Sequence, residues 1–114
     1  MKRQMINSIV ELIEASIDDK VVGIHGRPPV LTFFGFLHGF AYARKPDHPE
    51  DYAFLADFDM WIHERFRITL THSWAKIIHF FARSDKEEIE MLTELFREYM
   101  AQRSDDVGSE PNVE

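Results

Sequence analysis

The chain has 114 residues, a net charge of −7 and no cysteine. One domain of roughly 100 residues accounts for this length, and the lack of cysteine excludes thiolate zinc sites, disulfide bonds and a cysteine nucleophile. Four of the 20 acidic residues follow Arg103, the last basic residue, so the preceding body carries a net charge of only −3. A net-negative body without a basic stripe argues against nucleic-acid binding and favours a basic protein partner.

The N-terminus begins with basic residues, as a signal peptide does, but Glu11 and Glu14 interrupt its apolar stretch. We therefore expect a helix here rather than an export signal. No apolar run approaches the roughly 20 residues that a membrane-spanning helix needs. We predict a cytoplasmic protein without a membrane partner.

Residues 4–17 show isoleucine and valine at helical spacing, with acidic residues on the other side, and predict a first helix. The following segment, 18–26, contains Val-Val-Gly-Ile, which fits a short strand or an extended connector. We prefer the connector, because the sequence has no second alternating apolar run that would pair with a strand.

The most apolar part of the chain is 26–44, which opens with an Arg-Pro-Pro turn. Because proline restricts the backbone, we expect a second helix to begin at Pro29 or Val30. Its apolar residues surround the helix almost completely, so we place it at the centre of the molecule. Gly35 and Gly39 each cost about 1 kcal/mol of helix propensity, and we expect a neighbouring helix to cross closely there; a membrane dimer motif is the alternative.

Two prolines in 45–50 end this helix, and we expect a third helix from Pro49 or Asp51 to Phe66, capped by Asp47 or His48. A fourth helix is predicted after 67–71, capped by the hydroxyl of Thr71. The predicted inward faces of these two helices are Tyr52, Leu55, Phe58, Ile62 and Phe66 in the third and Trp74, Ile77, Ile78 and Phe81 in the fourth.

Ser84 and Glu87 form a capping-box pattern that predicts the start of a fifth helix. Its expected inward face consists of Ile89, Leu92, Leu95, Phe96 and Tyr99, and its glutamates point mostly outward. The pattern as a whole predicts an all-α, five-helix, antiparallel bundle-like domain over residues 1–103, followed by a disordered acidic tail over 104–114.

Histidine spacing does not predict a metal site. His72 and His79 are seven residues apart, farther than one ion bridges on a single helix. His63 and Glu64 lack the second histidine of a zinc-protease motif. A zinc site would have to combine residues of separate helices, such as His38, His63 and His79. We therefore predict no metal and no cofactor, with a small metal-dependent enzyme as a rival class.

No pattern in the chain predicts catalysis. Catalytic carboxylates act in pairs within a cleft, whereas the acidic residues here are expected on solvated helix faces. Ser73 follows His72 directly and has no nucleophile elbow around it. The sequence also has no glycine-rich phosphate loop. We predict that the protein is not an enzyme.

The stretch 47–59 holds five acidic residues and no lysine or arginine. It is either a solvated surface or a recognition surface for a basic partner, because clustered acids steer association. The candidate contacts are Asp47, Glu50, Asp51, Asp57 and Asp59, with Glu87, Glu90 and Glu94 as a second patch.

Aromatic residues exceed what one apolar stripe per helix can bury. Phe34, Trp61 and Phe80 lie off the main stripes. They are candidate exposed anchors for a protein partner or for a second copy of the chain. We include Trp61 among the predicted partner contacts.

Several motifs together resemble those of small α-helical bacterial immunity proteins of polymorphic toxin and contact-dependent growth inhibition systems. They are Arg27-Pro28, the pattern FxxFLxGFxxA from Phe33 to Ala43, the WIHERF sequence ending at Phe66, a Thr-x-x-Trp-x-x-Ile-Ile element from Thr71 to Ile78, and the acidic last helix. One difference is Pro29-Val-Leu-Thr, which stands where such proteins often have methionine-tyrosine-glycine.

The resemblance implies stoichiometric binding of a cognate toxin domain, such as a cationic nuclease, whose active site the acidic surface would block. A helical regulatory or adaptor subunit without catalysis is the alternative function.

Overall fold

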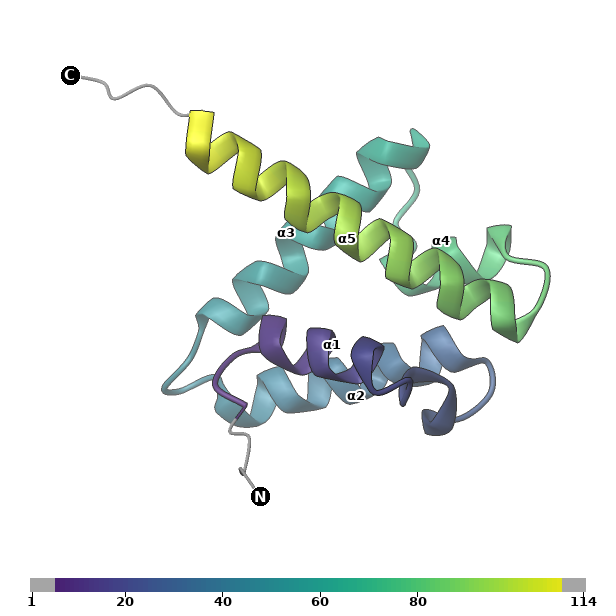
Figure 1. Ribbon diagram of the computed structural model, residues 1–114, viewed down its shortest axis with the longest axis horizontal. Coiled ribbons are helices and arrows are strands. Elements are labelled where there is room, and N and C mark those ends of the chain that lie inside the picture. The colour runs from purple at the N-terminus through teal and green to yellow at the C-terminus, as the bar shows by residue number, and fades with distance from the viewer. Residues whose placement is uncertain (1–5, 110–114) are drawn as a thin grey trace.

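Five α-helices and one short 3-10 helix form the part of the chain that the computed structural model describes, residues 6–109 (Figure 1). The elements are α1 (Ile9–Asp18), η1 (Val22–His25), α2 (Pro29–Arg44), α3 (Glu50–Phe66), α4 (Trp74–Phe81) and α5 (Asp85–Ser109). No strand occurs within these residues. The predicted all-α, five-helix fold is therefore confirmed. The Val-Val-Gly-Ile segment is a connector, as preferred, but it forms a 3-10 helix and not the extended chain that we expected.

Helix α2 is the element that the others surround. Figure 1 shows α1 and α2 side by side and antiparallel, with α5 crossing α3 on the other side of the molecule. The helix contacts η1, α1, α3, α4 and α5, so its predicted central position is confirmed. None of the helices in residues 6–109 is long and apolar enough to cross a membrane.

The core consists of side chains from all five helices. Its largest fully buried members are Trp74, Phe33, Phe58, Ile9, Leu37, Leu55, Ile62, Ile78 and Leu92. The predicted inward position of Phe81 is wrong, because its side chain is 44% exposed. Phe81 is the last residue of the short helix α4, and its ring stacks on Phe66 at the edge of the core. Tyr52 and Phe66 are only partly buried, and Phe54 takes the inward position on α3 instead.

The two glycines of α2 do not mark a helix crossing. A β-carbon built at Gly35 or Gly39 would meet no atom within 4 Å in the described part of the chain. The expected close approach of a neighbouring helix is therefore wrong. Gly35 and Gly39 are exposed, as is Tyr42 at 65%, whereas Phe36, which is 41% exposed, stacks on the ring of His25 in η1.

The starts of α1 and α4 and the cap of α3 differ from the sequence-based expectation. Helix α1 begins at Ile9, later than predicted, because the Ser8 hydroxyl accepts the N–H of Glu11 and caps the helix there. Helix α4 is capped by Ser73 rather than Thr71. Neither Asp47 nor His48 caps α3, which starts after Pro49 without a side-chain cap among the described residues.

The Ser84 cap of α5 is confirmed, whereas the second hydrogen bond of the predicted capping box is shifted by one residue, to the N–H of Arg83. The Ser84 hydroxyl accepts the N–H of Glu87, and the Glu87 carboxylate accepts the N–H of Arg83. The helix continues to Ser109, past the predicted domain end at Arg103. The rest of the predicted tail, 110–114, lies outside the described residues.

Candidate functional site

An open groove with a volume of 770 Å³ runs between α2, α3 and the segment 67–73 that leads into α4. Phe34, Leu55 and Trp74 contribute apolar surface to it. Met60 of α3 and Leu70 of the connecting segment also line it and are 61% and 63% exposed. The groove therefore combines a buried apolar floor with apolar side chains that solvent still reaches.

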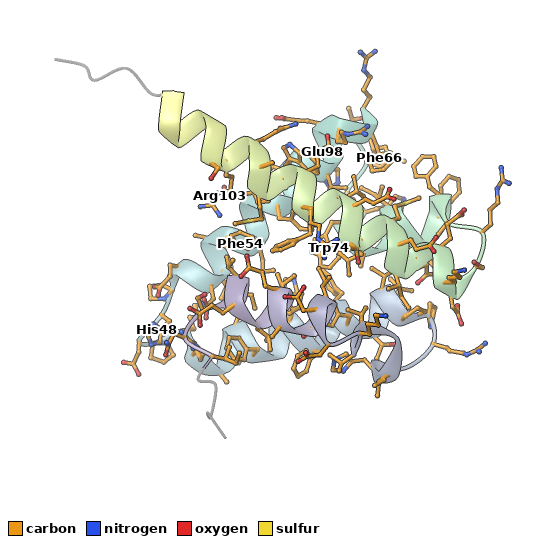
Figure 2. The ribbon with its side chains drawn as sticks, viewed as in Figure 1. His48, Phe54, Phe66, Trp74, Glu98 and Arg103 are labelled. Atoms are coloured by element: carbon orange, nitrogen blue, oxygen red, sulfur yellow. The ribbon has the colours of Figure 1, made fainter. Side chains whose placement is uncertain are left out.

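Trp74 anchors the floor of the groove. Figure 2 shows this side chain in the middle of the molecule, and it is 1% exposed. Its ring meets Phe34 and Phe58 edge-on, at centroid distances of 5.4 and 5.3 Å. Edge-to-face contacts of this kind add to the stabilisation from burial. Because Trp74 is the first residue of α4, its packing also holds that helix against α2 and α3.

His38 is the histidine of α2 that lines the groove. Its ring lies on Phe34, with a centroid distance of 4.1 Å, and meets Tyr52 edge-on. Burial lowers the pKa of His38 below 6.5, and the nearby Asp59 carboxylate only partly opposes this effect. The groove therefore favours a neutral imidazole at this position.

His63 has the opposite preference. Its Nδ1 atom is 2.8 Å from the backbone oxygen of Asp59, and its Nε2 atom is 3.1 Å from the backbone oxygen of Leu70. Both partners only accept hydrogen bonds, so the ring satisfies both contacts only when both nitrogens carry protons. The hydrogen bond to the Asp59 backbone is the main reason that the pKa of His63 is raised above 6.5.

The carboxylate of Asp59 joins α3 to the start of α4. Its Oδ1 atom accepts the N–H of Trp74 at 2.8 Å, and its Oδ2 atom lies 3.4 Å from Nδ1 of His63. The first N–H groups of a helix have no partner within the helix, and the helix dipole favours a negative charge near them. Asp59 therefore stabilises α4 from a neighbouring helix.

Asp51 performs the same role for α1. Its Oδ1 atom accepts the N–H of Ile9 at 3.1 Å, and its side chain is 1% exposed. The Oδ2 atom lies 3.1 Å from Nε of Arg44, but the two groups are not aligned for a hydrogen bond, so their pairing is coulombic. Arg44 also donates to the backbone oxygen of Asn7, which ties the start of α1 to the end of α2.

Glu88 completes this set of three helix-joining carboxylates, Asp51, Asp59 and Glu88. Its Oε1 atom accepts the N–H of Val30 at 3.1 Å, in the first turn of α2, which has no side-chain cap of its own in the described part of the chain. Its Oε2 atom accepts a hydrogen bond from His79. The expectation that Glu88 faces solvent is wrong, because the residue is 3% exposed.

The acidic side chains of the predicted stretch 47–59 do not form one surface in the structure. Asp47, Glu50 and Asp57 are exposed, whereas Asp51 is buried and so cannot contact a partner while the helices stay packed. Seven residues make about two helical turns, so Glu50 and Asp57 lie on one side of α3, and Asp59 lies on the opposite side, in the groove.

Glu50 also has a local partner at the turn between α2 and α3, because its Oε2 atom lies 3.0 Å from Nδ1 of His48. Figure 2 shows His48 at the edge of the molecule, far from Trp74. Hydrogen bonds to its own backbone N–H and to His48 lower the pKa of Glu50. This carboxylate is therefore remote from the groove.

The second predicted patch remains partly available. Glu87 is partly buried and engaged in the capping box, whereas Glu90 and Glu94 are exposed on α5. These positions share one side of the helix through spacings of three and four residues. The Glu90 carboxylate lies 4.0 Å from the ammonium group of Lys86 on the same helix.

The three aromatic residues proposed as anchors have different positions. Trp61 is partly buried between α3 and α5, where its indole N–H donates to Gln102 and its ring contacts Tyr99. Phe34 is partly buried and lines the groove. Phe80 is 78% exposed and fits an anchor best by exposure, but it does not line the groove.

Residues 6–104, whose side chains the structure describes, contain no group of three histidine or carboxylate side chains arranged to hold a metal ion. His38 and His63 both line the groove, whereas His79 pairs with Glu88 elsewhere. Sequence analysis did not identify the groove; the four-residue spacing of Asp59 and His63 was the one signal that they face each other.

The chain matches no protein-family model, no curated protein and no solved structure.

Proposed function

We propose that the chain is a non-catalytic immunity-type protein, which neutralises a toxin domain by occupying it in a stoichiometric complex. The observation that carries this proposal is the groove, in which Met60 and Leu70 are exposed beside an apolar floor. Partner proteins insert anchoring side chains into grooves of this kind, and exposed apolar side chains at the edge of the groove are buried when the complex forms.

The hydrogen bonds of the groove support binding over turnover. Asp59 accepts the N–H of Trp74, and His63 contacts two backbone oxygens. A general acid or base must exchange its proton with a substrate, and here that exchange would disturb contacts that position α4 and the connecting segment. These groups therefore serve the architecture of the groove.

Charge supports a basic partner. The body of the chain is net negative, and Glu50, Asp57, Glu90 and Glu94 are exposed on two different helices. Such a distribution accelerates the encounter with a positively charged protein over long distances. A cationic nuclease domain, which the sequence resemblance implies, is a toxin of this kind.

The test is co-expression with the product of the gene immediately upstream, which the proposal expects to be the toxin. We expect restored growth and a 1:1 complex by size-exclusion chromatography with light scattering. The double variant Met60→Asp with Leu70→Asp should abolish both effects. The matched control is Ile24→Asp, because Ile24 is 76% exposed on η1 and does not line the groove.

Two results would contradict the proposal. One is restored growth without a complex, accompanied by turnover of a substrate that a single polar substitution removes from the folded protein. The other is a stable complex with a non-toxic neighbour, which would favour the adaptor function.

A further inference from the structure

The row of side chains that α3 presents to the groove changes character along the helix. Ala56, Met60 and Glu64 follow one another at four-residue spacing, and all three line the groove. Residues at this spacing are neighbours on a helix surface, with β-carbons about 6 Å apart. This wall of the groove is therefore apolar for two turns and acidic at the third.

The two carboxylates that line the groove differ in availability. Asp59 is engaged by the N–H of Trp74 and by His63. Glu64 is exposed and has no ion pair and no side-chain hydrogen bond with the side chains that the structure describes, residues 6–104. Its neighbour Arg65 turns instead to Glu98 of α5, with 3.0 Å between Nε and Oε2. Glu64 is thus the carboxylate of the groove that a partner's cation can still reach.

The lining of the groove also selects against anions. It includes the carboxylates of Asp59 and Glu64, the imidazoles of His38, His63 and His72, and no lysine or arginine among the described residues, so the permanent charges of the lining are negative. His63 carries a positive charge when protonated, but its charge is already matched by Asp59. A phosphate or carboxylate ligand would therefore meet net repulsion in the groove, whereas a cation would gain a partner.

We infer that the groove receives a segment of the partner protein in which a lysine or arginine stands beside a large apolar residue. The aliphatic stem of the basic side chain lies along Met60 and its charged head reaches Glu64, because long basic side chains bury their stems and keep their heads in water. The apolar neighbour contacts the floor at Phe34 and Trp74. The inference rests on the proposed function, which requires a protein partner.

The experiment titrates the full-length, ¹⁵N-labelled protein with four dipeptide amides and follows the backbone signals of the groove. The probes are Ac-Leu-Arg-NH₂, Ac-Leu-Gln-NH₂ without the cation, Ac-Leu-Glu-NH₂ with an anion, and Ac-Gly-Arg-NH₂ without the apolar side chain. We expect the first probe to shift the signals of Met60, Glu64 and Leu70 and to bind about threefold more tightly than each of the others, as an exposed ion pair allows.

A matched pair of variants locates the cation. Glu64→Gln should reduce binding of Ac-Leu-Arg-NH₂ to the level of Ac-Leu-Gln-NH₂, and added salt should have the same effect on the unchanged protein. Glu14→Gln, an equally conservative change at an exposed position of α1 outside the groove, should leave binding unchanged. Retention of the native spectrum by both variants excludes misfolding as the cause.

The inference is overturned if no probe binds, if Ac-Leu-Gln-NH₂ or Ac-Leu-Glu-NH₂ binds as well as Ac-Leu-Arg-NH₂, or if the shifts lie outside the groove. Failure of the probes together with a 1:1 toxin complex would refute the groove chemistry alone. Binding of the probes as expected, without complex formation or protection from the toxin, would refute the proposed function alone.

Discussion

The corner around Asp51 and the groove around Asp59 contain the same arrangement in different surroundings. Both residues belong to α3, and each accepts the N–H of the first residue of another helix, at 3.1 Å for Ile9 and 2.8 Å for Trp74. The Asp51 side chain is 1% exposed and pairs with Arg44. The Asp59 side chain is 36% exposed and pairs with His63.

Because of this difference, the two regions contribute differently to folding stability and to its dependence on pH. Arginine stays charged at every physiological pH, and a buried ion pair that loses one partner leaves the other charge without compensation. Histidine changes its charge near neutral pH, and solvent around Asp59 screens its interactions. The corner therefore contributes mainly to folding stability, whereas the groove combines a weaker helix cap with sensitivity to pH.

The largest expected effect is at the buried corner. Asp51→Ala should lower the free energy of unfolding by about 3 kcal/mol, because it leaves the Arg44 guanidinium without its carboxylate and removes the acceptor of the Ile9 N–H. Urea denaturation at neutral pH measures this change. Asp51→Asn should cost less, since an amide oxygen still accepts the N–H. Asp47→Ala, at an exposed position, is the control and should change stability by less than about 0.5 kcal/mol; equal effects at both positions would contradict the comparison.

Glu88 extends the comparison to a second buried site. Glu88→Ala should cost about 2 kcal/mol, because the N–H of Val30 loses a charged acceptor in the interior. Glu88→Gln retains an acceptor and should cost less. Chemical denaturation of both variants beside Glu94→Ala, an exposed glutamate of the same helix, tests this order. A Glu88→Ala protein as stable as the control would show that α2 does not need this cap.

Asp59 should show a smaller effect than either buried residue. Asp59→Ala removes the acceptor for the N–H of Trp74 and should cost about 1 kcal/mol, the usual value for a helix cap. Asp57→Ala removes a carboxylate two residues earlier that faces away from the groove, and it should be nearly neutral. Thermal and urea unfolding of the two variants provide the measurement, and a cost at Asp59 as large as at Asp51 would remove the distinction between the two regions.

The smallest effects concern pH and should have opposite signs at His38 and His63, two of the three histidines that line the groove. The pKa of His63 is raised, so its stabilisation is fully present below its unfolded pKa of about 6.5 and is lost as pH rises through the folded pKa. His63→Gln should therefore reduce stability more at about pH 5.5 than at about pH 8.5. Unfolding free energies measured across this range test the prediction, which a pH-independent cost would contradict.

His38 reverses this dependence. Its pKa is lowered, so the neutral form is favoured and its contribution is present above about pH 6.5 and lost as pH falls through the folded pKa. His38→Phe should therefore gain stability relative to the unchanged protein as the pH falls. The same series of unfolding curves measures this change, and parallel pH profiles of the two proteins would contradict it.

Residues close together in the chain predicted most of the helices. The capping box of Ser84 and Glu87 acts over three residues, and the apolar spacing that marks α2 and α3 repeats every three or four. One error concerned the cap of α4, which was predicted at Thr71 and lies at Ser73, two residues later. The groove was not predicted, because its lining extends from Phe34 to Trp74 and forms only when α2, α3 and α4 pack.

The sequence by itself determined the all-α class, the number of helices and their approximate bounds, since the hydrogen bonds and apolar contacts that decide them join residues one turn apart. Only the tertiary structure decided which carboxylates face a partner and which hold the helices together. The N–H groups accepted by Asp51, Asp59 and Glu88 lie 42, 15 and 58 residues away along the chain. Composition and spacing are the same for a carboxylate in solvent and one at the start of another helix, so only packing tells them apart.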